Sequence, residues 1–314
     1  MECADPDFPN FYRPSHETAK IGADNPDNYY ERAQINGNYD YKITGKRGTV
    51  PYLQFMTMGG GYGEDGKNEC TGSIATSFSS DTDFELEADG SFVVWVSSEK
   101  KAGNWLPANS RSNTLLVRQT FMDRSNEQKA TISIERVDAA ARPKPLRPET
   151  LANNLRSTAA FVKGTATLFA DWSESYLPKP NELPPSDQAL CQSVGGDPGI
   201  FYYHSYYDLA EDEALIVEFE HIPECDNWNL QVDNYWMESL DYRYHKIHVN
   251  KHTAQYNADG SCTVVIADSN PNHPNWLELA GHRKGTLCAR WIGARTEITH
   301  PKTRVVKLTE LINE

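Results

Sequence analysis

The residues best suited to chemistry are concentrated in residues 226–252, DNWNLQVDNYWMESLDYRYHKIHVNKH. Tryptophan, tyrosine, asparagine, aspartate, arginine and histidine occur there at a density that an ordinary strand or loop does not need. A purely structural segment has an apolar face and a solvated face, whereas this one interrupts its apolar positions with hydrogen-bonding side chains. We therefore expect the functional site in this stretch.

Three carboxylates, Asp233, Asp241 and Asp27, are candidates for acid/base chemistry. Two carboxyl groups about 5–10 Å apart across a cleft can act as acid and base on a glycosidic or similar bond. Each also has a structural explanation. Asp27 can stabilise a turn in the sequence N-P-D-N, and Asp241 can pair with Arg243 or Arg118.

Four histidines, at positions 245, 248, 252 and 273, raise the question of a metal site. The spacing H-x2-H-x3-H is not completed by any Cys or carboxylate spacing of a known metal signature. We therefore expect no metal and no cofactor, and histidines that are exposed or hydrogen-bonded. His273, in the polar turn H-P-N-W, is the candidate catalytic histidine.

The remaining polar and aromatic side chains are candidates for binding. Aromatic rings can stack on a sugar, although a sandwich core also uses them, so we expect about half to be structural. Arg118 and Arg290 lie among apolar residues of strands, and an inward arginine needs an anion, favoured here as an internal carboxylate. The candidate substrate-binding residues are Asp27, Arg118, Asn234, Trp236, Tyr242, Arg243, Asn250, Asn275 and Trp276.

Charge and composition limit the partners of the 314-residue chain. Its 44 Asp and Glu exceed its 30 Lys and Arg, and the net charge of −14 repels a nucleic-acid backbone. No apolar run approaches the roughly 20 residues of a membrane span, no secretory signal is visible, and the six cysteines are scattered. We expect a cytoplasmic protein with a small-molecule or carbohydrate ligand, no nucleic-acid partner and no membrane partner; a homo-oligomer is left open.

The elements that must position these side chains are short strands. Apolar runs separated by turn residues favour a sandwich or barrel over βαβ units. Asn36-Gly37 predicts a hairpin between residues 31–35 and 39–43, and Asp89-Gly90 predicts a second after residues 83–87. Apolar residues at 3.6-residue spacing beyond Pro148 predict one long helix at about 149–175.

An internal repeat relates the two halves of the chain. A-D-G-S at residues 88 and 258, N-W-L at 104 and 275, and T-L before an arginine at 114 and 286 give offsets of 170, 171 and 172. L-Q at residues 53 and 230 suggests a further match at an offset of 177. This order favours duplication of a β unit. Features in both copies should be structural, whereas residues 232–243 lie where the second copy diverges.

The motifs D-N-Y-W at 233–236, E-S-L-D-Y-R at 238–243 and H-P-N-W-L at 273–277 resemble a large, mainly bacterial family, domain of unknown function 1214. N-P-D-N at 25–28 and V-R-Q-T-F at 117–121 look like its upstream pattern. The resemblance covers nearly the whole chain from Asn25. It implies an antiparallel β-sandwich of jelly-roll type and supplies no catalytic residues.

Together these observations predict an all-β protein with two related antiparallel, jelly-roll-like sandwich halves and one long helix between them. The expected parts are an arm at 1–24, a first half at 25–142, a linker with the helix at 143–199, and a second half with the site at 200–314.

Two functions are considered for that site. The first is an enzyme, a hydrolase or lyase, that acts on a small polar or glycosylated substrate in an aromatic-lined pocket. Asp241 or Asp233 would be its acid/base, with His273, Asn234 and Asn250 orienting the substrate. The alternative is a noncatalytic carbohydrate or small-molecule binding module. The many ionisable groups favour the enzyme.

Overall fold

The chain folds into two compact units in a computed structural model that describes residues 5–63, 66–77, 83–139, 142–143 and 145–312. Unit 1 comprises Met1–His16, Asn28–Thr165 and Gln192–Asp197, and unit 2 comprises Glu17–Asp27, Ala166–Cys191 and Pro198–Glu314. The division is not contiguous in sequence. Glu17–Asp27, which precedes the first strand of unit 1, belongs to unit 2, and Gln192–Asp197, which precedes the first strand of unit 2, belongs to unit 1.

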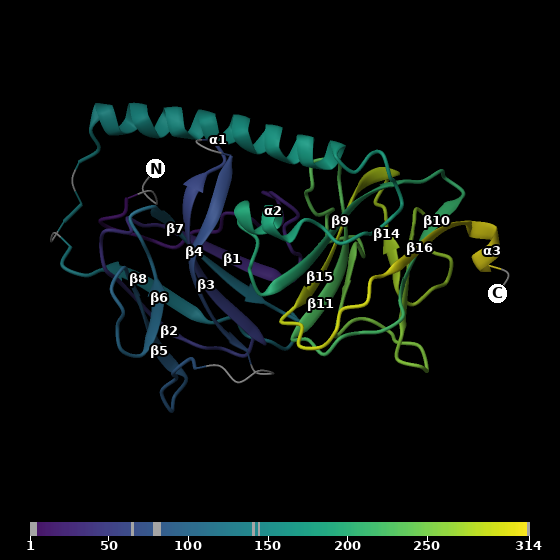
Figure 1. The fold of residues 1–314 in the computed structure, drawn as a ribbon, viewed down its shortest axis with the longest axis horizontal. Coiled ribbons are helices and arrows are strands. Elements are labelled where there is room, and N and C mark those ends of the chain that lie inside the picture. Colours follow the sequence, from purple (N-terminus) through teal and green to yellow (C-terminus); the bar gives the residue numbers. More distant parts are fainter. Residues whose placement is uncertain (1–4, 64–65, 78–82, 140–141, 144, 313–314) are drawn as a thin grey trace. The chain divides into compact units, whose positions relative to one another are not determined.

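Each unit contains two four-stranded sheets, visible as blue strands in unit 1 and green to yellow strands in unit 2 (Figure 1). The strands of unit 1 are β1 (Asn28–Gln34), β2 (Tyr41–Lys46), β3 (Tyr52–Gly61), β4 (Lys67–Ser77), β5 (Ser91–Ser97), β6 (Asn104–Pro107), β7 (Ser112–Thr120) and β8 (Thr131–Arg136). Those of unit 2 are β9 (Ile200–Asp208), β10 (Glu213–Phe219), β11 (Asn227–Asp233), β12 (His248–Asn250), β13 (Cys262–Ala267), β14 (Trp276–Glu278), β15 (Lys284–Ile292) and β16 (Lys302–Lys307).

The two units have the same topology. The sheet orders β1-β7-β3-β4 and β6-β5-β2-β8 of unit 1 correspond strand for strand to β9-β15-β11-β12 and β14-β13-β10-β16 of unit 2. Even the parallel pairs agree, because β5 with β6 and β13 with β14 are parallel while the other pairs are antiparallel. The mainly β fold and the internal repeat are confirmed.

Alternation along the strands builds one core between the two sheets of each unit. Successive side chains of a strand point to opposite faces. In unit 2, Leu230 on β11 and Trp291 on β15 share a buried cluster with Val217 on β10 and Val264 on β13. In unit 1, strands β2, β3, β5 and β7 contribute in the same way. Each unit is therefore a sandwich, and the second face of the sheet β9-β15-β11-β12 is left for other uses.

Two predicted hairpins are wrong. Strand β1 pairs with β7, and β2 pairs with β5 and β8, so Asn36-Gly37 connects two different sheets. Asp89-Gly90 does form a tight turn, with a positive φ at Gly90, but residues 83–87 that lead into it are not a strand. A local turn signal indicates where the chain reverses, whereas the partner of each strand is decided by which apolar face it buries.

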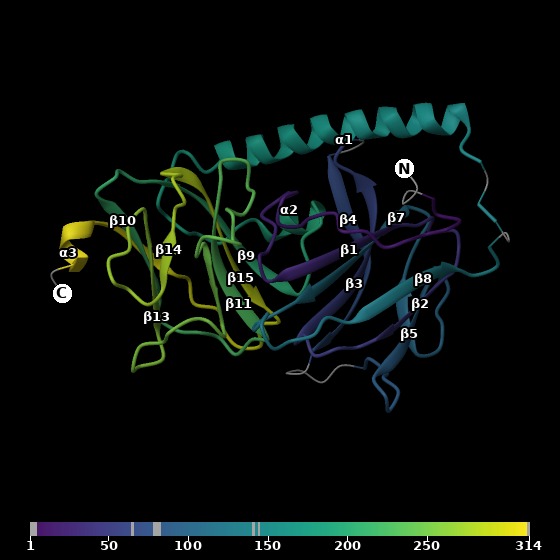
Figure 2. The same ribbon diagram turned by 180° about the vertical axis from the view of Figure 1, so that it is seen from behind.

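The long helix α1 (Pro148–Glu174) confirms the prediction at 149–175 to within one residue at each end. Two short helices, α2 (Gln188–Ser193) and α3 (Leu308–Ile312), were not predicted. Figure 2 shows α1 from behind, as a single helix. None of the helices in the described ranges is long and apolar enough to cross a membrane.

Strand register corrects one part of the repeat. Arg118 on β7 lies opposite Gln54 on β3, and Arg290 on β15 lies opposite Asn229 on β11. Gln54 therefore corresponds to Asn229, at an offset of 175, and the proposed match of Gln54 with Gln231 is two residues out of register. By the same register, Ser73 corresponds to His248.

Candidate functional site

The face of the sheet β9-β15-β11-β12 that points away from the core is polar and yet buried. On β11 the alternation sends Trp228, Leu230 and Val232 into the core, and Asn229, Gln231 and Asp233 onto the opposite face, where none of them is exposed. Buried polar groups need hydrogen-bond partners. The cover of this face must therefore be polar as well.

The cover is the segment Glu17–Asp27 of the same unit. Asn25 accepts a hydrogen bond through Oδ1 from Asn229 Nδ2 at 2.7 Å, and the Asp24 carbonyl accepts one from Gln231 Nε2 at 2.9 Å. The Ala23 carbonyl accepts one from Arg290. Side chains of β11 and β15 thus fix this irregular segment through its backbone.

An equivalent interaction exists in unit 1, which identifies it as structural. Arg118 donates to Gln54 Oε1 at 2.8 Å and to the Gly195 carbonyl, much as Arg290 donates to Gln231 Oε1 at 2.5 Å and to the Ala23 carbonyl. Neutral carbonyl groups thus accept from both guanidinium groups. Arg118 lies in unit 1, in an arrangement that does not include the polar face of unit 2.

Asp27, His248 and Asn250 form a set without a counterpart in unit 1. Asp27 Oδ1 accepts hydrogen bonds from His248 Nε2 at 3.1 Å and Asn250 Nδ2 at 2.9 Å, and Oδ2 accepts from Asn229 Nδ2 at 3.3 Å. Asp27 is only 2% exposed, whereas the side chain of His248 is 24% exposed. A buried carboxylate therefore orients an imidazole that reaches solvent.

The residues that the repeat relates to this set carry different side chains. Register places Ser73 at the position of His248 and Ala75 at that of Asn250. The repeat offset of 172, which also relates Pro26 to Pro198, relates Asp27 to Gly199, which lies at the start of a segment of unit 2. Gly199 has no carboxylate to accept a hydrogen bond from an imidazole, and Ala75 has no amide to support one. The set is therefore not a feature that both repeats need for folding.

Asp233 and Asp24 are two further buried carboxyl groups of unit 2. Burial, and next the neighbouring charge of Asp24, raise the pKa of Asp233 to about 7, while a hydrogen bond from Gln231 opposes the shift. Burial also raises the pKa of Asp24, against hydrogen bonds from Ser239 N and Oγ at 3.0 and 2.8 Å. Asp233 Oδ2 has no hydrogen-bond partner among the described residues. Such an oxygen is least costly when the carboxyl group is protonated.

Lys20 anchors the loop that follows β11. Its ammonium group donates to the carbonyls of Ser239 and Leu240, the latter at 2.6 Å, and lies 4.6 Å from the centre of the Tyr242 ring. Burial lowers the pKa of Lys20, and the charges of Asp24 and Asp241 oppose that shift. Lysine and cover segment together hold the loop at residues 234–240 against the sheet.

Comparisons with known proteins agree with this architecture. The family described as "Protein of unknown function (DUF1214)" matches residues 27–121 and 208–296, more than half of the chain. The chain belongs to the DUF1214 family. The predicted resemblance is confirmed, and the two matched regions lie largely in the two repeats.

Two solved structures are similar to this DUF1214 chain. A putative uncharacterized protein from Burkholderia cenocepacia is 54% identical, with a TM-score of 0.95 over 99% of this chain and 84% of that one. The VPA0106 protein from Vibrio parahaemolyticus is 12% identical, with a TM-score of 0.52 over 95% of this chain and 91% of that one, and shows the fold alone. No curated protein matches the chain.

The predicted site residues fall into separate places. Asp27, Asp233 and Asn250 lie on the polar face described above. Asp241 instead forms an exposed ion pair with Arg243, whose guanidinium donates to both carboxylate oxygens at 2.9 and 2.7 Å, and these hydrogen bonds lower the pKa of Asp241. This is the structural alternative that the sequence offered for Asp241.

The loop after β11 carries three more predicted residues. Asn234 accepts through Oδ1 from the backbone N–H groups of Trp236 and Glu238, at 2.9 and 3.1 Å, and so shapes the loop. Trp236 is 51% exposed and meets Tyr235 edge to face, and Tyr242 packs under Lys20. The contacts of these aromatic side chains therefore differ, with Tyr235 for Trp236 and with Lys20 for Tyr242.

His273, Asn275 and Trp276 lie on a different part of unit 2. Asn275 holds the backbone of Gln255 and Thr263, and Trp276 Nε1 donates to the Ala267 carbonyl at 3.0 Å. Asn104 and Trp105 make the same kind of backbone hydrogen bonds in unit 1. Burial lowers the pKa of His273, whose Nδ1 accepts from Asn275 N. The repeat supports a structural role for the N-W-L segments.

The histidines of residues 245–273 are likewise dispersed. His245 pairs with Glu278 at 2.8 Å, and His248 pairs with Asp27. Within the described ranges, no group of three His, Cys, Asp or Glu side chains is placed to hold a metal ion.

Sequence reasoning missed Lys20, Asp24, Asn229 and His248 as members of the polar face. A signal for β11 was present, since N-W-N-L-Q-V-D alternates strictly between polar and apolar residues, with amide and carboxyl side chains at every polar position. A polar face made of amides, and free of lysine and glutamate, indicates a buried polar surface better than a solvated one.

Proposed function

We propose that this chain is an enzyme that acts on a small polar organic molecule by general acid/base catalysis, with His248 as the catalytic base and Asp27 as its positioning residue. The observation that supports this most directly is the pairing of a 2% exposed carboxylate with Nε2 of a partly exposed imidazole. The same relationship orients the histidine in known acid/base sites.

The hydrogen-bond pattern determines which nitrogen reacts. An ionised Asp27 can only accept, so Nε2 of His248 carries a proton and Nδ1 of the neutral ring holds the lone pair. Among the described residues, Nδ1 has no hydrogen-bond partner. Asn250 and Asn229 each donate to Asp27 and so hold the carboxylate in place. The imidazole is thus free to take a proton from a substrate at Nδ1 and to return it.

His248 suits this role better than the carboxylates that the sequence put forward. Asp241 is held as an anion by Arg243, and its lowered pKa makes it a weak base. Asp233 is fully buried on the sheet face, so a substrate cannot reach it without displacing the cover segment.

One observation favours the alternative, a noncatalytic carbohydrate or small-molecule binding module. Trp236 exposes half of its surface on the loop where the two repeats diverge, and an exposed indole is a suitable surface for a sugar ring. A binding module would need Trp236 but not the proton transfer of His248.

A turnover screen separates these functions. The purified chain is incubated with panels of esters, amides, glycosides and sulfated or phosphorylated metabolites, and products are detected by mass spectrometry. With His248→Asn, turnover should fall by a factor of about 100 or more, as expected for loss of a general base. The matched control is His245→Asn, three residues away and paired with Glu278.

Each outcome has a definite meaning. Equal turnover by His248→Asn and the wild type would overturn the assignment of the base. Ligands that bind without any product, and whose affinity falls with Trp236→Ala but not with His248→Asn, would establish the binding module.

Two structural proposals accompany this function. The described cysteines, Cys70, Cys191, Cys225, Cys262 and Cys288, are all free, which supports a reducing compartment such as the cytoplasm. The jelly-roll description is kept as a proposal for the path of each sandwich, supported by its two four-stranded sheets; the parallel β5/β6 and β13/β14 pairs depart from a purely antiparallel jelly roll.

A further inference from the structure

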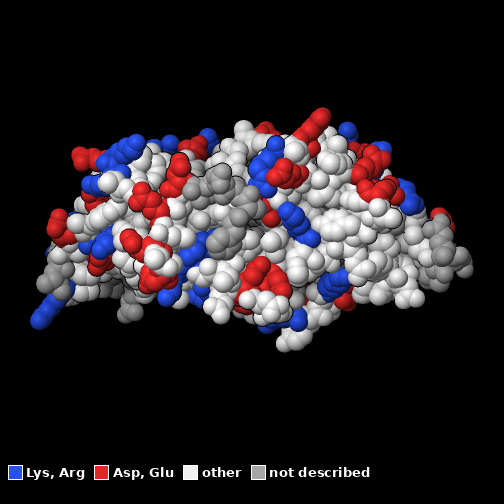
Figure 3. All heavy atoms as spheres, turned by 90° about the horizontal axis from the view of Figure 1, so that it is seen from below, with Lys and Arg blue, Asp and Glu red and all other residues white. Residues whose placement is uncertain are grey.

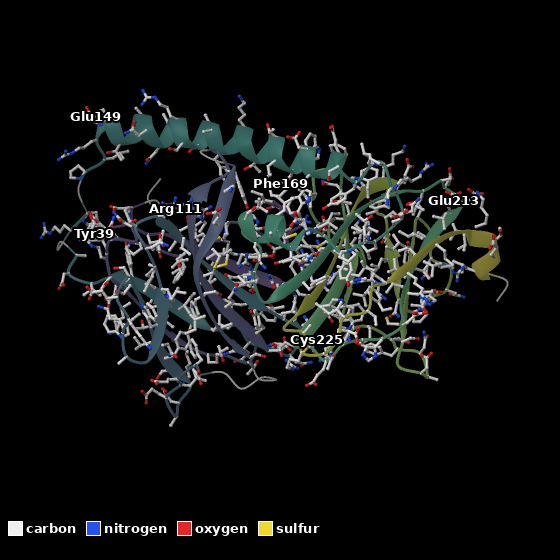
Figure 4. The ribbon with its side chains drawn as sticks, in the orientation of Figure 1. Tyr39, Arg111, Glu149, Phe169, Glu213 and Cys225 are labelled. Carbon is white, nitrogen blue, oxygen red and sulfur yellow. The ribbon has the colours of Figure 1, made fainter. Side chains whose placement is uncertain are left out.

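The first part of α1, with the segment before it, reverses the charge balance of the chain. Residues 142–163 contain five Lys and Arg, at positions 142, 144, 147, 156 and 163, against a single acid, Glu149, in the first turn of α1 (Figure 4). The whole chain carries a net charge of −14. On the face shown in Figure 3, acidic and basic side chains are interspersed. A stretch with this excess of positive charge is therefore unusual in this protein.

The same part of α1 exposes a stripe of aliphatic side chains. Leu155 and Val162 are 58% and 61% exposed, and Leu146, just before the helix, is 57% exposed. Leu151, Leu155, Ala159 and Val162 follow one another at spacings of four and three residues, so they share one face of the helix. Soluble helices normally turn such a face toward a core.

The opposite face of α1 is the one that packs on unit 1. A Cβ added at Gly164 would lie 2.0 Å from the Tyr62 carbonyl oxygen, and one added at Gly63 would lie 2.3 Å from the Ala160 carbonyl carbon. The helix and the β3–β4 hairpin therefore touch backbone to backbone, and the Phe161 ring stacks on Tyr62. At about 100° per residue, Leu155 and Val162 lie opposite Ala160 and Gly164, and so face solvent.

Positive charge borders the stripe. Arg156 and Lys163 each follow a stripe residue by one position, so both lie along the same edge of it. Long basic side chains beside an aliphatic stripe can extend to a negative surface while the stripe is buried in it.

We propose that this face of α1 binds the surface of a membrane rich in anionic lipid. The helix would lie in the plane of the interface, with Leu155 and Val162 inserted and Arg156 and Lys163 at the phosphates. The sequence-based expectation of no membrane partner rested on the lack of a spanning segment, and binding to the surface requires none. The inference does not depend on the proposed catalytic role of His248.

Two other occupants fit the face less well. A second copy of the chain, paired with α1 antiparallel across a two-fold axis at the middle of the stripe, would set Arg156 of each copy near Lys163 of the other, and like charges repel. A protein partner is normally held by aromatic anchors such as Trp and Tyr, whereas this stripe is made of Leu, Val and Ala.

Vesicle co-sedimentation of the full chain tests the proposal. The vesicles are phosphatidylcholine alone, or an equal mixture of phosphatidylcholine and phosphatidylglycerol. We expect binding only to the mixed vesicles, weakening as salt is raised. The double variant Leu155→Ser/Val162→Ser should bind at least tenfold more weakly. Leu190→Ser, which removes a leucine 40% exposed on α2, is the control and should bind like the wild type.

A second pair of variants isolates the charge contribution. Arg156→Gln/Lys163→Gln should weaken binding about tenfold or more, whereas Lys302→Gln/Arg304→Gln, with the same loss of charge on β16, should have little effect. Circular dichroism checks that every variant is folded.

Three results would overturn the proposal. The first is a failure of the wild type to bind the mixed vesicles, and the second is an equal loss of binding in the α1 variants and the control variants. The third result is a dimer in sedimentation velocity that Leu155→Ser/Val162→Ser abolishes. The last result would assign the stripe to a second copy of the chain.

Discussion

Asp233 occupies in unit 2 the strand position that Met58 occupies in unit 1. Met58 lies opposite Thr114, and Asp233 lies opposite Thr286, the residue related to Thr114 by the repeat offset of 172. Both side chains are buried, at 2% and 0% exposure. A thioether is apolar and loses little on burial, whereas an ionised carboxylate loses its hydration. Burial is therefore the largest cause of the raised pKa of Asp233.

This substitution predicts a pH dependence of stability. The pKa of Asp233 is raised from 3.8 to about 7, so the folded state holds a proton that the unfolded state has lost, and stability falls as pH rises through that window. His204 has the opposite effect. Its burial, and next the charge of Arg290, lower its pKa from 6.5 to about 3, so stability is lost as pH falls from 6.5 toward 3.

The two contributions oppose one another between about pH 4 and pH 6.5, and single variants should separate them. In Asp233→Asn, the free energy of unfolding should rise by about 3 kcal/mol from pH 4 to pH 6.5, because the His204 contribution is no longer offset. In His204→Gln, it should fall by about 4 kcal/mol from pH 4 to pH 7.

Urea unfolding at each pH measures both slopes. Asp241→Asn is the control, since the lowered pKa of that exposed carboxyl group places its titration below this range. Identical slopes for Asp233→Asn and the wild type would show that Asp233 is ionised in the folded protein.

Removing the Asp27 carboxylate should destabilise unit 2 strongly. Asp27→Ala removes the oxygens that accept from Asn250 Nδ2, Asn229 Nδ2 and His248 Nε2, and of these donors Asn229 retains its hydrogen bond to Asn25 Oδ1. Each unsatisfied buried donor costs about 1–3 kcal/mol, so we expect a loss of about 3 kcal/mol or more. Asp259→Ala, in an exposed turn where the carboxylate accepts from Ser261 N and Oγ, should cost less than about 1 kcal/mol. Equal losses in urea unfolding would contradict a special role for Asp27.

Gly164→Ala tests how α1 is held on unit 1. Alanine is the better helix former by about 1 kcal/mol, so in a free helix the substitution would stabilise. Here the added Cβ would meet the Tyr62 carbonyl oxygen at 2.0 Å, and overpacking of this kind costs about 1–3 kcal/mol. We expect net destabilisation and faster amide exchange in residues 148–165. Gly61→Ala, where an added Cβ meets nothing within 4 Å, is the control, and a more stable Gly164→Ala protein would show that the contact is loose.

The loss of either strand arginine should also be costly. Arg118→Met and Arg290→Met each remove the donor that serves a glutamine oxygen and a backbone carbonyl of a crossing segment. We expect losses of about 2–4 kcal/mol in both, since at least two acceptors lose their donor in each case. A large loss for Arg290→Met alone, measured by urea unfolding, would show that the two interactions are not equivalent.

Sequence patterns predicted the elements that depend on local periodicity. The helix at 149–175 and the duplicated A-D-G-S and N-W-L segments follow from spacing and turn chemistry alone. Strand partners did not follow, because β1 and β2 are neighbours in sequence but bury their apolar faces in different sheets.

The site was predicted only in part, for a physical reason. Asp27 and Asn250 were named, but His248 was set aside, since nothing in the sequence shows that a segment ahead of β1 lies on β11 and β12. By residue type, Asp241 was an equally suitable acid/base candidate. In the structure it instead pairs with Arg243, two residues further along the chain. Chemistry by residue type can be read from sequence, whereas proximity between residues 200 positions apart cannot.

The exchange of leading segments between the units has a consequence for how the protein is made. Because Gln192–Asp197 belongs to unit 1, the acceptor that Gly195 offers to Arg118 is translated after every strand of that unit. A first sandwich that folded before residue 195 was synthesised would therefore bury the Arg118 guanidinium without its backbone acceptor. In the second sandwich the order is reversed, since Glu17–Asp27 is already synthesised when β11 appears. In the order of translation, the backbone acceptor of Arg290 thus precedes the strands of its sandwich, whereas that of Arg118 follows them.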